Sequence, residues 1–102
     1  MLNFNTLFTK FRTKMILKGI TVMKIYDYKG KKNICGNRVK EARKRMHLSQ
    51  TDLAAKLQVE EVILERDSVS RIESGTRFVT DYELKALAKI LRVDVIWLLG
   101  GI

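Results

Sequence analysis

The chain has 102 residues, no proline and a formal net charge of +9 at pH 7. This length suits one domain with a modest core, and the lack of proline favours helices. The basic balance suits a polyanionic partner. Cys35 is the only cysteine, which excludes an internal disulfide. Because no Cys/His cluster accompanies it, no metal site is predicted.

No arrangement of catalytic residues stands out in the sequence. His47 is the only histidine, and its place at a predicted helix end is explained by contact with the helix dipole. There is no glycine-rich phosphate loop and no clear pair of carboxylates. We therefore expect no enzymatic activity and no cofactor. Cys35 is interpreted as a small packing residue in a reducing compartment, and the expected location is the cytoplasm.

Residues 1–22 carry four positive charges and no negative one. Their longest apolar run, Met15 to Leu17, is too short for a membrane span or a secretory signal, so no membrane insertion is expected. Such a segment could instead touch a membrane surface or act as a transit peptide. We favour a third interpretation, in which translation naturally starts at Met23. The codons for Lys18-Gly19 can spell a ribosome-binding site at a suitable distance upstream.

Residues 24–34 mix β-prone residues with a basic cluster, Lys29–Lys32, around Gly30. This pattern predicts an extended arm, with a short strand at Lys24–Tyr28. The arm is either a solvated tail or a segment that lies along a phosphate backbone. The sequence thus divides into a basic N-terminal tail over residues 1–32 and a helical domain over residues 33–102.

The first predicted helix covers Gly36–Met46, where apolar residues recur at helical spacing and most others are basic. Ser49 has the character of an N-cap, with an acidic residue three positions later that forms a short capping box. The second helix is expected over Gln50–Gln58, with its leucines buried. The connection over residues 59–65 is longer than a tight turn, and its apolar run Val62–Leu64 is expected to enter the core.

The third helix is expected over residues 65–74, and Gly75 ends it because the position after a helix often needs a positive φ. At about 100° per residue, Val69 and Ile72 share one face. Such a helix can bury this face while it offers compact polar groups to a groove. The alternative is an ordinary amphipathic surface helix. The opposite, polar face comprises Asp67, Ser70, Arg71 and Ser74.

Two further helices are predicted toward the C-terminus. Thr80 and Glu83 fit a capping box for a helix over Asp81–Leu91, which places its leucines on one side. Asp94 caps a last short helix, Val95–Leu99, and two glycines stop it.

Four stretches of the helical region together form a specific pattern. Two of them contain Leu-Ser-Gln-x-x-Leu-Ala and Val-Ser-Arg-Ile-Glu-x-Gly, in this order and with flanking helices. In these stretches the sequence resembles the Cro/phage-repressor type of helix-turn-helix regulator, also called XRE-like, from about residue 33 to residue 99. The chain departs from the family pattern in a connection about five residues longer than usual and in Glu65, which replaces a small hydroxyl cap. The matching stretches are Asn37–Lys44, Leu48–Leu57, Ser68–Gly75 and Leu84–Leu91.

The resemblance implies an all-α fold of five helices, preceded by an extended or disordered N-terminal segment. It implies a sequence-specific regulator of transcription, a repressor in the simplest case, that binds double-stranded DNA with helix 65–74 in the major groove. Glu73 matches a residue that pairs with a first-helix arginine, here Arg43. Base-edge contacts are implied for Arg66, Asp67, Ser70 and Arg71, and backbone contacts for Gln50, Thr76 and Arg77; the hydroxyl of Ser68 also suits phosphate.

One such helix reads too few base pairs to select a site in a genome, and the resemblance implies a homodimer that meets successive major grooves. The C-terminal end is the expected pairing surface, unless all of its apolar residues close the monomer core around Leu87 and Leu91. Two other functions stay open: an antitoxin-like autoregulator that binds a toxin protein, and a module that binds protein or membrane surfaces. The apolar residues of the C-terminal end are Val95, Ile96, Trp97, Leu98, Leu99 and Ile102.

Overall fold

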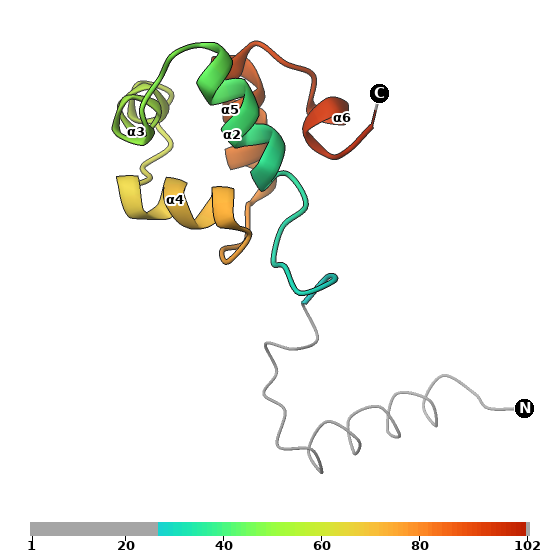
Figure 1. Cartoon of the computed structure of the whole chain (residues 1–102). Helices are drawn as coiled ribbons and strands as arrows, with labels where there is room; N and C mark the ends of the chain where they lie inside the picture. The colour runs from blue at the N-terminus through green and yellow to red at the C-terminus, as the bar shows by residue number, and fades with distance from the viewer. Residues whose placement is uncertain (1–26, 102) are drawn as a thin grey trace, which may run out of the picture.

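Five helices follow one another in residues 27–101, which is the part of the chain that the structure, a computed structural model, describes (Figure 1). The predicted all-α fold of five helices is confirmed, and the predicted helix ends agree to within one residue. The proposed start at Met23 and most of the predicted strand Lys24–Tyr28 lie outside the described residues. The helices are α2 (Gly36–Arg45), α3 (Gln50–Val59), α4 (Arg66–Ser74), α5 (Asp81–Leu91) and α6 (Val95–Leu98).

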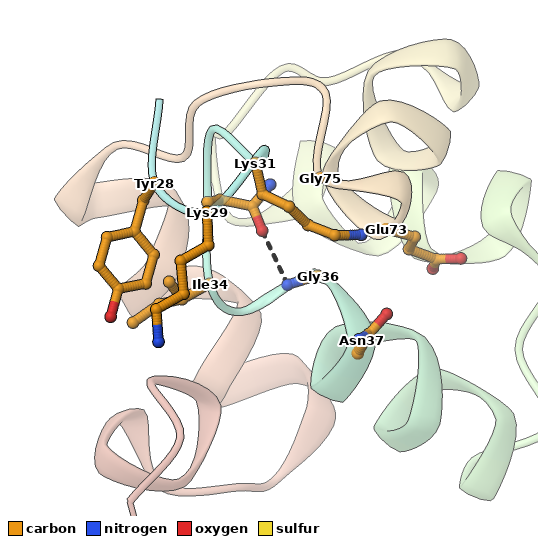
Figure 2. A pocket seen from close by; sticks show the side chains of 9 residues that line it. Tyr28, Lys29, Lys31, Ile34, Gly36, Asn37, Glu73 and Gly75 are labelled. Atoms are coloured by element: carbon orange, nitrogen blue, oxygen red, sulfur yellow. Dashed lines mark hydrogen bonds between the residues drawn. The ribbon is translucent and has the colours of Figure 1, made fainter. Parts of the chain in front are cut away.

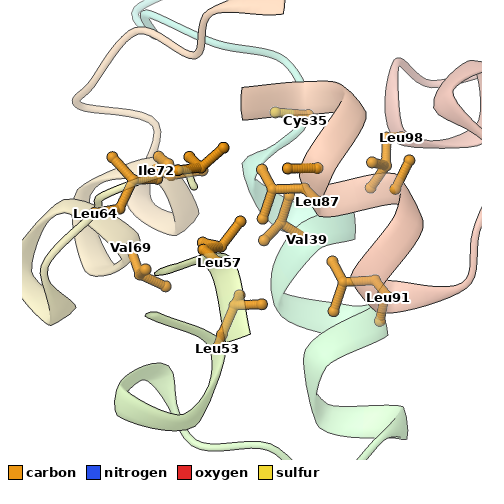
Figure 3. Close-up of a cluster of buried hydrophobic side chains, with 14 residues drawn as sticks. Cys35, Val39, Leu53, Leu57, Leu64, Val69, Ile72, Leu87, Leu91 and Leu98 are labelled. Atoms are coloured by element: carbon orange, nitrogen blue, oxygen red, sulfur yellow. The ribbon is translucent and has the colours of Figure 1, made fainter. Parts of the chain in front are cut away.

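The hydrophobic core lies where α2, α3, α4 and α5 meet, and Leu98 of α6 closes one end of it (Figure 3). Each helix contributes apolar residues at the three- and four-residue spacing that places them on one face. Burial of a leucine or isoleucine side chain stabilises the fold by about 1.5–3 kcal/mol. The largest completely buried side chains are Leu53, Leu57, Ile72, Leu87, Leu98, Val39 and Val69.

The connection between α3 and α4 enters the core at alternate residues. Val62 and Leu64 are buried, whereas Ile63 is 71% exposed. The prediction that the whole run packs into the core is therefore wrong at Ile63. The reason is that neighbouring side chains of an extended segment point to opposite sides.

The helix ends follow two rules of capping. Ser49 and Thr80 each form the predicted capping box at the N-termini of α3 and α5. Glu65 before α4 makes no side-chain cap, and neither does Asp94 before α6, where a cap was predicted. At the C-termini, α2 to α5 are each followed within two residues by a residue of left-handed conformation, after which the next amide donates back into the helix. Only one of these residues is a glycine; they are His47, Glu61, Gly75 and Arg92.

A buried ion pair joins α2 to α4. Arg43 donates from Nε to Glu73 Oε2 at 2.6 Å and from Nη2 to Glu73 Oε1 at 2.9 Å. A third donor, Nη1 of Arg43, reaches the Leu48 carbonyl oxygen at 2.8 Å, and Gln50 Nε2 donates to Glu73 Oε1 at 3.1 Å. The hydrogen bonds with Glu73 raise the pKa of Arg43. Both charges are thus shielded from water and fully engaged with protein groups.

Removal of either charge is expected to destabilise the fold by about 3–5 kcal/mol, because the remaining charge would stay buried without its partner. The measurement is urea unfolding of Arg43→Ala, Glu73→Ala and the double variant. The double variant should lose clearly less than the sum of the single losses. Glu41→Ala removes an exposed pair with Arg45 and serves as the control, with an expected loss below about 1 kcal/mol. Additive losses for Arg43 and Glu73 would contradict the pairing.

Candidate nucleic-acid interface

Helix α4 lies at one edge of the helical domain and presents two very different faces (Figure 1). Val69, Ile72 and Glu73 are buried against the other helices. Asp67, Arg71 and Ser74, spaced by four and three residues, form an exposed polar stripe on the other side; Ser68 and Ser70 are half-buried beside it. Since its buried face is anchored in the core, α4 can hold this stripe rigidly.

The N-terminal end of α4 carries two exposed charged side chains. Arg66 Nη1 lies 3.7 Å from Asp67 Oδ1, and both side chains are more than 60% exposed. Such an exposed pair contributes little to stability, so either partner can exchange it for another contact at small cost. The first turn of α4 also directs its backbone N–H groups outward, which favours negatively charged ligands.

Gln50 lies at the start of α3, and its side chain is held against α4. Its amide nitrogen donates to Glu73 Oε1 at 3.1 Å, next to the bonds from Arg43. The structure therefore brings the predicted contact residue of α3 and the polar helix α4 together through one buried carboxylate. The amide of Gln50 is fixed in orientation by this bond.

The two predicted contact residues after α4 have different surroundings. Thr76 is exposed, and its hydroxyl lies 2.9 Å from that of Ser74. Arg77 instead donates from Nη1 and Nη2 to the two carboxylate oxygens of Glu83, at 2.9 and 3.1 Å, and from Nη1 to the Phe78 carbonyl oxygen. Arg77 thus holds the connection between α4 and α5 in place. A contact between Arg77 and a DNA phosphate would have to share or break these hydrogen bonds.

The Arg77–Glu83 pair is expected to make stability depend on pH. Burial raises the pKa of Glu83, but hydrogen bonds from Arg77 and from the Thr80 amide outweigh it, so the pKa lies below the ordinary 4.5. A pKa depressed in the folded state contributes stability above the unfolded pKa that is lost as the pH falls through the folded pKa.

Melting temperatures of the wild type should therefore fall below about pH 4.5. Glu83→Gln should be less stable near neutral pH and should show a shallower fall in acid. Glu61→Gln, at an exposed carboxylate, is the matched control and should follow the wild type. Identical acid slopes for Glu83→Gln and the wild type would refute the role of this pair.

The basic arm before α2 docks on the C-terminal end of α4. Tyr28 and Lys31 exchange two backbone hydrogen bonds, of 2.7 and 2.9 Å, across a turn in which Lys29 and Gly30 have positive φ. The amide of Lys32 then donates to the Gly75 carbonyl oxygen at 2.8 Å. The contacts of the helical domain thus begin before residue 33. The basic cluster in the sequence indicated that this segment is an arm, but no pattern in the sequence indicated that the arm docks on α4.

Asn33 connects the arm with three other segments. Its Nδ2 donates to the carbonyl oxygens of Ile72 and Arg77 at 3.0 and 2.8 Å, and its Oδ1 accepts from the Gly36 amide at 2.8 Å (Figure 2). A Cβ atom at Gly36 would overlap the Ile72 carbonyl oxygen, so only glycine lets α2 start this close to α4. Cys35, beside it, is buried, and this burial raises the pKa of its thiol.

The match to known proteins covers the helices from within α2 to the end of α6 and does not include the arm. The model of the helix-turn-helix family matches residues 39–98, which is more than half of the chain and spans α2 to α6. The chain belongs to the Cro/repressor-type helix-turn-helix family. This is a family of DNA-binding transcription regulators, and double-stranded DNA is the partner that the domain implies. Helices α3 and α4 are the two helices predicted as the helix-turn-helix pair. No curated protein and no solved structure matches the chain.

Within residues 27–101, none of the helices has the length and apolar character that a membrane span requires.

Proposed function

We propose that the protein is a homodimeric transcriptional repressor that reads the major groove of specific DNA sites with α4. The observation that carries this proposal is the contrast between the two faces of α4: one is locked into the core, and the other is an exposed stripe of short polar groups and arginine. A rigid helix with such a stripe fits a groove about 12 Å wide. A domain that occupies its site excludes other proteins from the same DNA, which makes repression the simplest outcome.

The residues proposed to contact base edges lie at the N-terminal end of α4 and along its exposed stripe. Arg66 and Arg71 can each donate two hydrogen bonds to guanine, whereas Asp67 can accept from cytosine and would repel nearby phosphates at wrong sites. Ser70, which is half-buried, can donate or accept at close range. The weak Arg66–Asp67 pair is easily exchanged for contacts with bases.

The groups proposed to contact the DNA backbone flank this stripe. Gln50 is held by Glu73 at the start of α3, and the hydroxyls of Ser68 and Thr76 lie near the two ends of α4. Hydroxyl and amide groups are common partners of phosphate oxygens. Arg77 would contribute less to phosphate binding than its charge suggests, because its guanidinium group already forms an ion pair with Glu83.

Arg71→Ala tests base reading directly. A preferred duplex is first selected from a randomised library, and dissociation constants are then measured for that duplex and a scrambled one. We expect a loss of about 1–3 kcal/mol on the preferred duplex and a smaller loss on the scrambled one. Arg92→Gly removes a positive charge at the far end of α5 and should affect both duplexes equally. Equal losses for Arg71→Ala would exclude base reading by this residue, and no preferred duplex at all would favour a general surface-binding module.

The C-terminal end supplies the proposed dimer interface. Leu98 is fully buried, and Val95 and Trp97 pack partly against the core, so these three serve the monomer. Ile96 is 64% exposed and Leu99 is 43% exposed. Ile102 lies outside the described residues. Two adjacent exposed apolar side chains can form a self-complementary contact around a two-fold axis.

Trp97 stabilises this end of the molecule through two arginines. The guanidinium groups of Arg38 and Arg45 lie 4.8 and 5.3 Å from the centre of its ring, and Arg38 also donates to the carbonyl oxygens of Trp97 and Gly101. Cation–π contacts of this kind contribute about 0.5–1 kcal/mol at exposed sites. The short helix α6 is thereby fixed on α2, as an interface requires.

Ile96→Glu should convert the dimer to a monomer, because the two introduced glutamates would face and repel each other across the two-fold axis. The measurement is sedimentation velocity, with and without a palindromic form of the preferred duplex. Ile63→Glu, at an equally exposed isoleucine in the α3–α4 connection, is the control and should leave the dimer intact. One protomer per site on DNA, with a footprint over a single groove, would show that dimerisation is not used.

A further inference from the structure

The C-terminal end of a helix is normally a poor place for a phosphate. Its last carbonyl groups carry about half a negative charge in sum, which repels anions. Yet α4 has only nine residues and is therefore about 13 Å long. If its N-terminal end lies on base edges in a groove about 12 Å wide, its C-terminal end lies close to the sugar–phosphate backbone. A phosphate can bind at this end only if other groups offset the negative partial charge of the carbonyl groups.

The N-terminal arm donates hydrogen bonds to carbonyl groups at this end. Lys31 Nζ donates to the Ser74 carbonyl oxygen at 3.3 Å, and the Lys32 amide donates to that of Gly75. Asn33 Nδ2 donates to the carbonyl oxygen of Ile72. Three consecutive arm residues thus donate to the carbonyl groups of Ile72 and Ser74 in the last turn of α4 and of Gly75 just after it, and Lys31 places its ammonium group among them.

Close packing fixes the path of the Lys31 side chain. Figure 2 shows it running past Gly75 toward the end of α4. A Cβ atom at Gly75 would lie 2.6 Å from Lys31 Cδ, so glycine leaves room for the lysine stem and also adopts the positive φ of 82°. The ammonium group therefore sits where the stripe of Asp67, Arg71 and Ser74 ends.

Two hydroxyl groups lie at the same place. Ser74 Oγ and Thr76 Oγ1 are 2.9 Å apart, and both residues are exposed, as is Lys31. Both hydroxyls also lie within hydrogen-bonding distance of the Arg71 carbonyl oxygen, at 3.1 and 3.4 Å, so donation to a phosphate requires each hydroxyl to rotate away from it. A phosphate oxygen can accept from an ammonium group and from hydroxyls together. Arg77, another cation near this end, forms two hydrogen bonds with Glu83 instead.

From this arrangement we propose that Lys31 of the arm, together with Ser74 and Thr76, binds a backbone phosphate of DNA beside the C-terminal end of α4. The arm thus supplies the positive charge that the family resemblance assigned to Arg77. The inference rests on the proposed DNA-binding function and adds a positioning contact to it. A phosphate contact carries no base information, so it fixes how deep and in which register α4 lies in the groove.

The test is the salt dependence of binding for Lys31→Gln, which removes the charge but keeps an N–H donor for the Ser74 carbonyl group. Dissociation constants are measured on the preferred and the scrambled duplex between about 50 and 200 mM salt. One lost phosphate contact should reduce the slope of log K against log salt by about 0.9 on both duplexes. Lys31→Arg should restore the slope. Lys56→Gln, a matched charge loss beside the cavity at the opposite end of α2, should leave it unchanged.

A second variant separates phosphate binding from helix capping. Ser74→Ala with Thr76→Val should weaken binding in the wild-type background and have a much smaller effect when Lys31→Gln is already present. A normal slope for Lys31→Gln, even with a lowered melting temperature, would show that Lys31 only caps the helix and would overturn the inference. If the wild type shows no preference between duplexes, the proposed function fails, and the slope on the scrambled duplex still decides the role of Lys31. Binding to neither duplex would overturn both proposals.

Discussion

The buried pair of Arg43 and Glu73 determines where α4 lies. Glu73 is on α4, Arg43 is on α2, and the hydrogen bond from Gln50 brings in the start of α3. A carboxylate in this place is stable only when every donor is correctly positioned. The geometry of the helix-turn-helix pair is therefore fixed by polar contacts, whereas the apolar core alone would tolerate small sliding movements of one helix on another.

This constraint also explains how the chain tolerates a long connection between α3 and α4. Six residues separate the two helices, and Val62 and Leu64 attach them to the core while Ile63 stays outside. The positions of the two helices do not depend on the length of the connection. Left-handed Glu61 ends the turn after α3, and the ion pair of Glu73 holds α4. An insertion at this place therefore changes the loop and leaves the relative position of the two helices to the ion pair.

Local patterns in the sequence were sufficient to predict the helices. The capping boxes at Ser49 and Thr80 and the positive φ of Gly75 depend on residues close in sequence, and they occur as predicted. The partners of Arg77 and the docking place of the arm depend on long-range geometry, and propensity does not reveal them. The match of Glu73 to Arg43 came from the family pattern, and without it helical periodicity would have placed Glu73 only at the border of the buried face. Ile63 shows the same limit, because an apolar run in a loop does not reveal which of its residues turn inward.

The burial of Cys35 makes the junction of arm, α2 and α4 accessible to chemical measurement. This cysteine is the only one in the chain, it is 2% exposed, and burial raises the pKa of its thiol. A thiol reagent reacts with the thiolate and needs access to the sulfur, so alkylation requires the junction to open first. The alkylation rate of the unmodified protein thus reports how often the base of the arm separates from α4, and a change in that rate upon DNA binding would measure how strongly the nucleic acid holds the junction closed.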